Sequence, residues 1–494
     1  MAFPLKMLAF DLGASSGKMF LSSFNGRSLS LDPIDRFSNG PVAVHDELFW
    51  NVLDIYTHCL NGIQLAVGEH GPIASMGIDS FSNDFGLLDK HGRFTTQVHC
   101  YRDGRVKRNE TKIYEIISRQ ELHALSGNQN ALFGTAMHLA SMRLEDQGYL
   151  LDGAGSLLFI PDLLIYFLTG QIQAEYTIAS VSQMMNFETA AWSTEILAKL
   201  GIPEHILPAI IPTGSVSGKV TALTDGPELE MISVCEHDTA SAFLAAPWGD
   251  EAIIISSGTW SLVGLESKAP IINDTTYSCN IANEGGYPGH HRLLKNVMGQ
   301  WIIQQCRLSF KEMGEDLSIQ ELMALAETEA PFRYWIYPDD ERFFSPGNMP
   351  QKIGEFCEEF GQGRPLSIGR IIRCVVESLA LQYRHAIEEL EAVSHKAFSL
   401  INIVGGGSNN RLLNQCVANA TGRRVIAGPS EATALGNLLV QLIAHGEIST
   451  IEEGRTLLKN SIPVQVFDPE DSSAWEACYQ EYVRSITPLQ ESYS

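Results

Sequence analysis

The sequence predicts an α/β protein made of two halves with the same local architecture. Each half opens with an apolar strand, a turn rich in serine and glycine, and a second strand, over residues 7–24 in the first half and 253–264 in the second. Elsewhere, apolar residues recur at the three-to-four spacing of amphipathic helices. We therefore expect an ancient duplication, with one domain over residues 1–246 and a second over 247–494.

Composition places the chain among globular proteins and makes some classes of binding partner unfavourable. Of its 494 residues, 45% are hydrophobic and 19% are charged, which excludes disorder and coiled coil. The 34 basic and 58 acidic residues give a net charge of −24. Such a surface repels nucleic acid and anionic membranes, although backbone N–H groups can still bind a small anion locally.

Targeting and cysteine signals favour a soluble cytoplasmic protein. The sequence does not reveal the oligomeric state, and either a monomer or a homodimer is expected. The most apolar stretch, 157–168, is interrupted by Pro161 and Asp162 and is shorter than the ~20 residues of a membrane span. No signal peptide is recognisable at the start. The nine cysteines form no CxxC pairs, so reduced single thiols are expected, although Cys357 and Cys374 could pair.

The first strand ends at Asp11 and leads into the turn Gly13–Lys18. Alternating apolar residues then resume at Met19, and Asn25-Gly26 is a strong hairpin signal. The glycine-containing turn should therefore join two strands, rather than a strand and a helix.

Four interpretations of that turn follow. A P-loop requires four residues between its glycines and a Ser or Thr after Lys18, and the sequence has neither. A nucleophile elbow on Ser15 would make the protein a serine hydrolase, but it requires a following helix. A phosphate cradle of backbone N–H groups, hydroxyls and Lys18 fits, with Asp11 positioned to hold Mg²⁺. An ordinary Gly/Ser turn is the alternative without function.

The middle of the first half is predicted to contain a strand pair at 73–79 and 85–89, closed by a turn at 89–92. Helices are expected over 132–144 and 157–168. A strand at 232–234 leads into Glu236-His237-Asp238, and residues 247–250 are expected to form a linker.

His237 and Asp238 allow three interpretations. A metal pair lacks a further ligand at a typical spacing. A buried aspartate beside a core histidine would need no function. Alternatively, Asp238 is a general base that accepts the proton of a sugar hydroxyl as that hydroxyl attacks a phosphate.

The second half contains two further glycine-rich loops. Ser256–Thr259 repeats the first turn, so the two loops together suggest a shared polyphosphate. A strand at 398–404 leads into Gly405-Gly406-Gly407, which lacks the third glycine of a dinucleotide fingerprint. These glycines could form a platform for a nucleotide, or packing alone could require them. A long amphipathic helix is predicted from Ile372 to Leu390, and the last ~45 residues carry no recognisable motif.

Together these residues resemble the FGGY carbohydrate kinases, and most of all the rhamnulokinase branch of that family. The family elements are Asp11–Lys18, His237–Ala242, Ser256–Ser261 and Val404–Gly407. The branch features are Tyr101–Asp103, Asn283–Gly286, Leu294–Gly299, Glu377–Leu381 and Val425–Pro429. The resemblance spans roughly residues 7–445.

The resemblance implies two actin-like domains of the ribonuclease H-like, hexokinase/actin superfamily, with a cleft between them. It implies ATP and Mg²⁺ as cofactors and phosphorylation of the 1-hydroxyl of a ketose, first of all L-rhamnulose. Asp238 would be the catalytic base and Asp11 would position Mg²⁺. The sugar would contact Ser82, Asn83, His237, Asp238, Thr239 and Asn296. ATP would contact Ala14, Ser15, Ser16, Gly17, Lys18, Gly258, Thr259, Gln304, Gly405, Gly406 and Gly407.

Two departures from the branch pattern bear on the sugar. The loop Ser80–Asp84 stands where the branch usually has Thr-Trp-Gly-Val-Asp, and Glu236 stands where a serine usually precedes the His-Asp pair. L-fuculose, a xylulose or a ribulose are therefore alternative substrates. An actin-like nucleotide-binding protein without sugar chemistry is the alternative from another class.

Overall fold

The computed structural model describes residues 4–221 and 229–493. Its contacts define two compact units, each made of several stretches of chain. Unit 1 comprises 1–247, 266–293 and 432–462, and unit 2 comprises 248–265, 294–431 and 463–494. The chain thus passes from one unit to the other within two strands, β17 (Trp260–Ser267) and β19 (His291–Met298). A domain boundary at 246/247 stays a prediction.

Unit 1 is built on a six-stranded sheet of order β14-β15-β6-β1-β2-β3. Its strands are β1 (Leu5–Leu12), β2 (Ser16–Phe24), β3 (Asp32–Ser38), β6 (Ser75–Ser80), β14 (Val216–Lys219) and β15 (Glu230–Ile232). β1 and β2 are antiparallel, and β1, β6 and β15 run parallel. The predicted hairpin around the first turn is confirmed.

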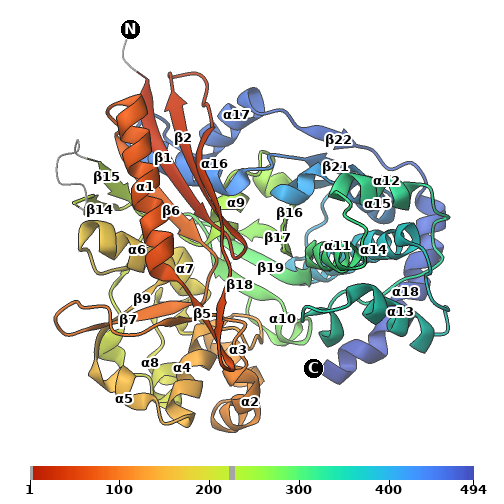
Figure 1. Ribbon diagram of the computed structural model, residues 1–494, viewed down its shortest axis with the longest axis horizontal. Helices are drawn as coiled ribbons and strands as arrows, with labels where there is room; N and C mark the ends of the chain where they lie inside the picture. The colour runs from red at the N-terminus through yellow and green to blue at the C-terminus, as the bar shows by residue number, and fades with distance from the viewer. Residues whose placement is uncertain (1–3, 222–228, 494) are drawn as a thin grey trace. The chain divides into compact units, whose positions relative to one another are not determined.

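Helices cover both faces of this sheet (Figure 1). Met76 and Ile78 of β6 join a core with α1 (Val52–His70) and α6 (Ile160–Thr169). The alternate residues Ser75 and Asp79 instead contact α16 (Ala432–Ala444), which packs beside α9 (Asp238–Leu244). A helix from late in the sequence therefore supports the first sheet.

Two predictions in the first half are wrong in part. The strands at 73–79 and 85–89 both exist, but β7 (Phe85–Asp89) pairs with β9 (Ala154–Phe159), because β6 is buried between β1 and β15. The predicted helix 157–168 begins only at Ile160, since its first residues belong to β9. The helix predicted at 132–144 is α4 (Thr135–Leu144).

The remaining elements of unit 1 surround these cores. The helices are α2 (Arg105–Ile116), α3 (Arg119–Ser126), α5 (Gly148–Gly153), α7 (Tyr176–Ser180), α8 (Thr194–Leu200), α10 (Asp274–Ser278) and α17 (Ile451–Ser461). The strands are β4 (Val42–Val44), β5 (Glu47–Trp50), β8 (Val98–His99), β10 (Ala174–Glu175), β11 (Met185–Asn186), β12 (Ala191–Trp192), β13 (Ile210–Ile211) and β18 (Ala282–Gly285).

Unit 2 repeats the strand plan of unit 1. In a sheet of order β18-β19-β17-β16-β20-β21-β22, β16 (Ile253–Ser257) pairs antiparallel with β17 and parallel with β20 (Leu400–Val404). β21 (Arg424–Ala427) continues the parallel set, and β22 (Gln465–Phe467) is an antiparallel edge. The first sheet has the same order of antiparallel and parallel neighbours along β2, β1, β6, β15 and β14. The repeated architecture is therefore confirmed.

Helix α14 (Ile368–Ser394) is the long amphipathic helix that the sequence predicts. The other helices of unit 2 are α11 (Trp301–Glu312), α12 (Ile319–Glu327), α13 (Met349–Glu359), α15 (Arg411–Thr421) and α18 (Ser472–Tyr493). The C-terminal helix was not foreseen, since its sequence carries no motif. Cys357 and Cys374 are buried free thiols. Across 4–221 and 229–493, no helix has the length and apolarity to cross a membrane.

Candidate active site

The turn between β1 and β2 is closed by its own backbone. Gly13 N donates to Ser16 O at 2.9 Å, and the Asn39 side chain donates to Gly13 O at 2.9 Å. A Cβ on Gly17 would lie 2.2 Å from the Phe37 ring, so packing requires this glycine. Ala14 and Ser16 are half-buried and Ser15 is exposed. β2 begins at Ser16, so the strand-to-helix elbow of a Ser15 hydrolase is absent from this part of the structure.

Asp11, Lys18 and Asp79 are cross-strand neighbours next to that turn. Asp11 pairs in register with Lys18 on β2 and with Asp79 on β6, and Lys18 Nζ lies 4.0 Å from Asp11 Oδ2. Asp79 is fully buried, and its Oδ1 has no hydrogen-bond partner among the described residues. Burial raises the pKa of Asp79 well above its usual range, and the charges of Asp11 and Asp238 raise it further.

Asp238 is the first residue of α9, directly after the loop that leaves β15. Its Oδ1 accepts hydrogen bonds from Thr239 N at 2.5 Å and Thr239 Oγ1 at 3.1 Å. The side chain is 29% exposed, so a ligand can reach it. Desolvation raises the pKa of Asp238, against the opposing effects of His237 and Thr239, and this makes the carboxylate a stronger base.

His237 is held between Asp238 and a buried ion pair. Arg292 Nη2 lies 3.0 Å from His237 Nδ1 and 2.9 Å from Glu284 Oε2. His237 Nδ1 also lies 3.4 Å from Glu284 Oε2. In a neutral ring that accepts from the Arg292 guanidinium at Nδ1, the proton lies on Nε2. His237 Nε2 is 3.5 Å from Asp238 Oδ1, so this tautomer directs an N–H toward the carboxylate.

In the loop after β6 only Ser82 is half-buried, while Phe81, Asn83 and Asp84 are buried. Phe81 is 7% exposed and packs against Trp50 with ring centroids 4.5 Å apart and planes tilted by 37°. Trp50 Nε1 donates to Asp84 Oδ2 at 2.5 Å. Ser82 is half-buried and accepts a hydrogen bond of 3.0 Å from the Asn83 amide, whose own Oδ1 has no partner among the described residues. The departure from the branch pattern therefore reaches the surface at Ser82, and Asn83 places that unsatisfied amide oxygen just beneath it.

In unit 2, the two glycine-rich loops lie side by side. A Cβ on Gly407 would lie 2.0 Å from Ser257 Oγ, and one on Gly405 3.1 Å from Ser257 O, whereas Gly406 has nothing within 4 Å. Gln300 N donates to Gly258 O at 3.0 Å and Trp301 N to Thr259 O at 3.2 Å. Gln304 is exposed one turn further along α11, and Asn296 is half-buried on β19.

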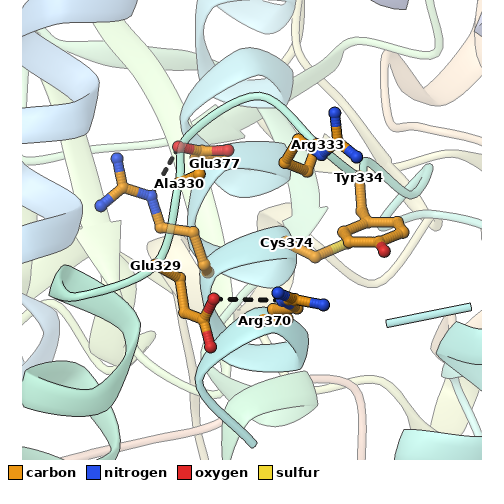
Figure 2. A pocket seen from close by; sticks show the side chains of 8 residues that line it. Glu329, Ala330, Arg333, Tyr334, Arg370, Cys374 and Glu377 are labelled. Carbon is orange, nitrogen blue, oxygen red and sulfur yellow. Dashed lines mark hydrogen bonds and ion pairs between the residues drawn. The ribbon is translucent and has the colours of Figure 1, made fainter. Parts of the chain in front are cut away.

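Figure 2 shows a pocket of about 80 Å³ in unit 2, next to α14. Arg370 pairs with Glu329 at 3.1 Å, and Arg373 pairs with Glu377 at 2.6 Å. None of its lining residues is among the predicted site residues. We assign this pocket no role in the chemistry.

The described side chains of unit 1 offer too few ligands to hold a magnesium ion alone, so the ion would bind there together with a phosphate. Among the residues described, no group of three or more His, Cys, Asp or Glu side chains is arranged to hold a metal. Mg²⁺ usually keeps several waters and binds through one or two carboxylates plus substrate phosphates. Asp11, beside the half-buried turn, offers such a carboxylate.

Two family sequence models match nearly the whole chain. The FGGY family of carbohydrate kinases matches with its N-terminal domain at residues 6–245 and its C-terminal domain at 253–445. The chain therefore belongs to the FGGY family of carbohydrate kinases, as its motifs predict.

Curated relatives agree over nearly their full length. A rhamnulokinase of Bacteroides thetaiotaomicron is 40% identical over 97% of this chain and 99% of that protein. A rhamnulokinase of Oceanobacillus iheyensis is 35% identical over 93% of this chain and 97% of that protein. A rhamnulokinase of Yersinia pestis is 36% identical over 98% of this chain and 99% of that protein.

Solved structures share the fold. Gluconate kinase from Lactobacillus acidophilus superposes with a TM-score of 0.81 at 16% identity, covering 99% of both chains. Plasmodium falciparum glycerol kinase with ADP gives 0.78 at 15% identity, covering 98% of both. The predicted two-domain α/β kinase fold is confirmed.

Several residues that shape the site were not predicted from the sequence. Glu284 lies in one of the family motifs, but no local sequence pattern indicates that it pairs with Arg292. Asn437, which donates to Asp79, lies in a helix without any motif. Asp79 lies near the end of its strand as Asp11 does, and this parallel could have revealed it.

Proposed function

We propose that this carbohydrate kinase transfers the γ-phosphate of ATP to the 1-hydroxyl of a ketose, L-rhamnulose, with Asp238 as general base. The observation that carries the proposal is the Asp238 carboxyl itself, part-exposed and oriented by His237 and Thr239. The similarity to proteins named rhamnulokinase over nearly the whole chain supports the choice of sugar.

In this reaction the sugar hydroxyl gives its proton to Asp238 while its oxygen forms a bond to the γ-phosphorus. The bond from that phosphorus to the bridging oxygen breaks, and ADP leaves. Phosphoryl transfer needs alignment and charge stabilisation more than covalent help. The raised pKa of Asp238 favours proton acceptance, because a stronger base takes the proton more readily.

The binding roles follow the two halves of the chain. In residues 1–246, Ser82, Asn83, His237 and Thr239 bind the sugar, and Ala14, Ser15, Ser16, Gly17 and Lys18 form the first phosphate loop. In 247–494, Gly258, Thr259, Gln304 and Gly405–Gly407 bind ATP, and Asn296 binds sugar. Asp11 holds Mg²⁺, which when bound neutralises phosphate charge. We propose a cytoplasmic enzyme, since ATP is its donor.

A second ketose is favoured by one observation. Two polar residues replace the usual glycine and valine of this loop, the half-buried Ser82 and the buried Asn83, whose Oδ1 has no partner among the described residues. These groups could select a sugar with a different hydroxyl configuration, such as L-fuculose.

Coupled ADP release with Mg²⁺·ATP tests the proposal against L-rhamnulose, L-fuculose, both xyluloses, both ribuloses, glycerol and gluconate. We expect turnover with L-rhamnulose, and NMR of the product should place phosphorus on carbon 1. Preference for another ketose would indicate that the altered loop at Ser82–Asn83 changes the sugar specificity. Silence with every sugar, with ATP still bound, would favour a nucleotide-binding protein without sugar chemistry.

Asp238→Asn tests the base. It should lower kcat by ~10²–10⁴-fold, the usual contribution of a general base. Asp46→Asn, at an exposed position, is the matched control and should retain normal turnover. Near-normal kcat in Asp238→Asn would overturn the assignment.

A further inference from the structure

Three carboxyl groups lie fully buried behind the loop that carries His237 and Asp238, and the proposed reaction uses none of them. They are Asp162 on α6, Glu175 on β10 and Glu236, each 0% exposed. Burying charge without compensation is costly. Their hydrogen bonds therefore indicate which of the three are ionised.

Burial raises the pKa of Glu175, but donors surround this carboxyl, so its ionised form is the best stabilised of the three. Its Oε2 accepts from Thr177 N at 2.8 Å, Thr177 Oγ1 at 2.5 Å and Ile178 N at 3.2 Å. The backbone N–H of Glu236 donates to the same oxygen at 3.2 Å, and Thr213 Oγ1 donates to Oε1. Glu175 therefore anchors the backbone of the catalytic loop at Glu236.

Asp162 and Glu236 instead face one another. The two side chains lie within hydrogen-bonding reach of one another, and Asp162 Oδ2 and Glu236 Oε2 have no hydrogen-bond partner among the described residues. Two ionised oxygens in this position would repel one another. One proton between them satisfies both atoms.

The surroundings decide which residue keeps that proton. Asp162 Oδ1 accepts the fixed backbone N–H of Glu175 at 3.3 Å and is also bonded by the Gln173 side chain. Within the described chain, the Glu236 carboxyl accepts only from side chains, which are Gln173 Nε2 at 3.5 Å from Oε1 and the hydroxyl of Ser233, which also bonds to Ser217. The anion is thus better stabilised on Asp162. The charged groups that face Glu236 are Asp162 from α6 and Glu175 from β10, and both favour its neutral form.

We propose that Glu236 is a positioning residue, which stays protonated and donates its proton to Asp162 to hold His237 and Asp238 in place. The backbone connects these sites directly. Ser80 N donates to Glu236 O at 2.8 Å, and His237 N donates to Thr177 Oγ1 at 3.2 Å. Displacement of the Glu236 side chain therefore moves the proposed base and its histidine.

This inference rests on the proposed function only for its kinetic consequence. Glu236→Gln keeps the shape and an N–H donor toward Asp162, whereas Glu236→Leu keeps bulk and removes the donor. Glu195→Gln, an exposed glutamate on α8, is the matched control. All three are compared in the full-length enzyme.

Infrared difference spectroscopy of the sugar-free enzyme at neutral pH reads the proton directly. Glu236→Gln should remove one carboxylic-acid C=O stretch that Glu195→Gln retains. Loss of a carboxylate band instead would overturn the proposal. This readout needs no turnover, so it stands even if no sugar proves to be a substrate.

Kinetics supply the second readout. Glu236→Gln should keep kcat within about threefold of wild type, because an isosteric donor replaces the acid. Glu236→Leu should lower kcat by ~10²-fold, the effect of a small misplacement of catalytic groups. Wild-type kcat should fall at alkaline pH as Glu236 ionises, and this fall should be absent from Glu236→Gln. Wild-type kcat in Glu236→Leu, or the same alkaline fall in Glu236→Gln, would overturn the positioning role.

Discussion

The side-chain amide of Asn437 donates a hydrogen bond of 2.6 Å to Asp79 Oδ2, although 358 residues separate the two in the chain. A Cβ on Gly77 would lie 2.5 Å from Asn437 Oδ1, so glycine at that position lets α16 approach β6. Gln441 Nε2 donates to Asn437 Oδ1 at 2.8 Å and also to Leu8 O. The late helix α16 thus fixes the carboxyl of Asp79 beside the turn between β1 and β2.

Asn437→Ala should destabilise the protein because it leaves both oxygens of buried Asp79 without a donor. An unsatisfied buried polar group costs about 1–3 kcal/mol, which urea unfolding will measure. Asn61→Ala, at an exposed position within α1, is the control and should leave the free energy of unfolding nearly unchanged. Equal effects of the two substitutions would show that the Asp79 contact contributes no stability.

Local sequence patterns predicted much of this protein, and long-range contacts account for most of what they missed. The turn at Gly13–Lys18 and the helix containing Leu379 follow from alternation and periodicity, which depend only on neighbours in the chain. The pairing of β7 with β9 does not, because sheet partners are selected by burial across the whole unit. Asp238 was found through a motif. Arg292 was missed because its role arises only when folding brings it to His237.

Arg292→Met should destabilise the protein by about 3–5 kcal/mol, since it leaves the buried carboxylate of Glu284 without its cation. Arg292 and Glu284 side chains are 1% and 6% exposed, so solvent cannot replace the partner. The KM for sugar should also rise, because His237 loses the Arg292 contact at Nδ1 that orients its ring.

The double variant Arg292→Met/Glu284→Gln separates charge from shape. Removing the unpaired charge of Glu284 should restore much of the stability. Chemical denaturation of the wild type, the two single variants and the double variant gives the coupling free energy. Additive effects of the two substitutions would contradict a direct ion pair.

Asp84→Asn should change how stability depends on pH. Burial raises the pKa of Asp84 well above its usual range, against the lowering effect of the Trp50 hydrogen bond. The folded state therefore retains a proton that the unfolded chain releases above its ordinary pKa of about 4. Stability from this group is fully present below that pH and is lost as pH rises toward the folded pKa, by about 1.4 kcal/mol per pH unit.

Thermal or urea unfolding between pH 4 and 7 measures this slope. Asp84→Asn should reduce the slope of the unfolding free energy against pH by up to the contribution of one bound proton. The substitution keeps a carbonyl acceptor for Trp50 Nε1. Asp46→Asn, at an exposed position, should leave the slope as in the wild type. A slope that Asp84→Asn does not change would place the titration elsewhere.

Gly406 and Gly407 separate the two explanations of the glycine platform, which are packing and nucleotide binding. A Cβ on Gly407 would lie 2.0 Å from Ser257 Oγ and 2.7 Å from Gln300 Nε2. Gly407→Ala should therefore cost about 1–3 kcal/mol of stability, as overpacking of a buried contact usually does. It should also raise the KM for ATP, because the same contact supports the loop at Gly258.

Gly406→Ala is the matched substitution one residue earlier, where a Cβ meets nothing within 4 Å. Its stability should equal that of the wild type in urea unfolding. If ATP lies on this surface, the added methyl group should raise the KM for ATP without changing the KM for sugar, because only the nucleotide contact is obstructed. Unchanged KM for ATP in Gly406→Ala, together with destabilised Gly407→Ala, would mean that packing alone requires these glycines and that ATP binds elsewhere in the chain.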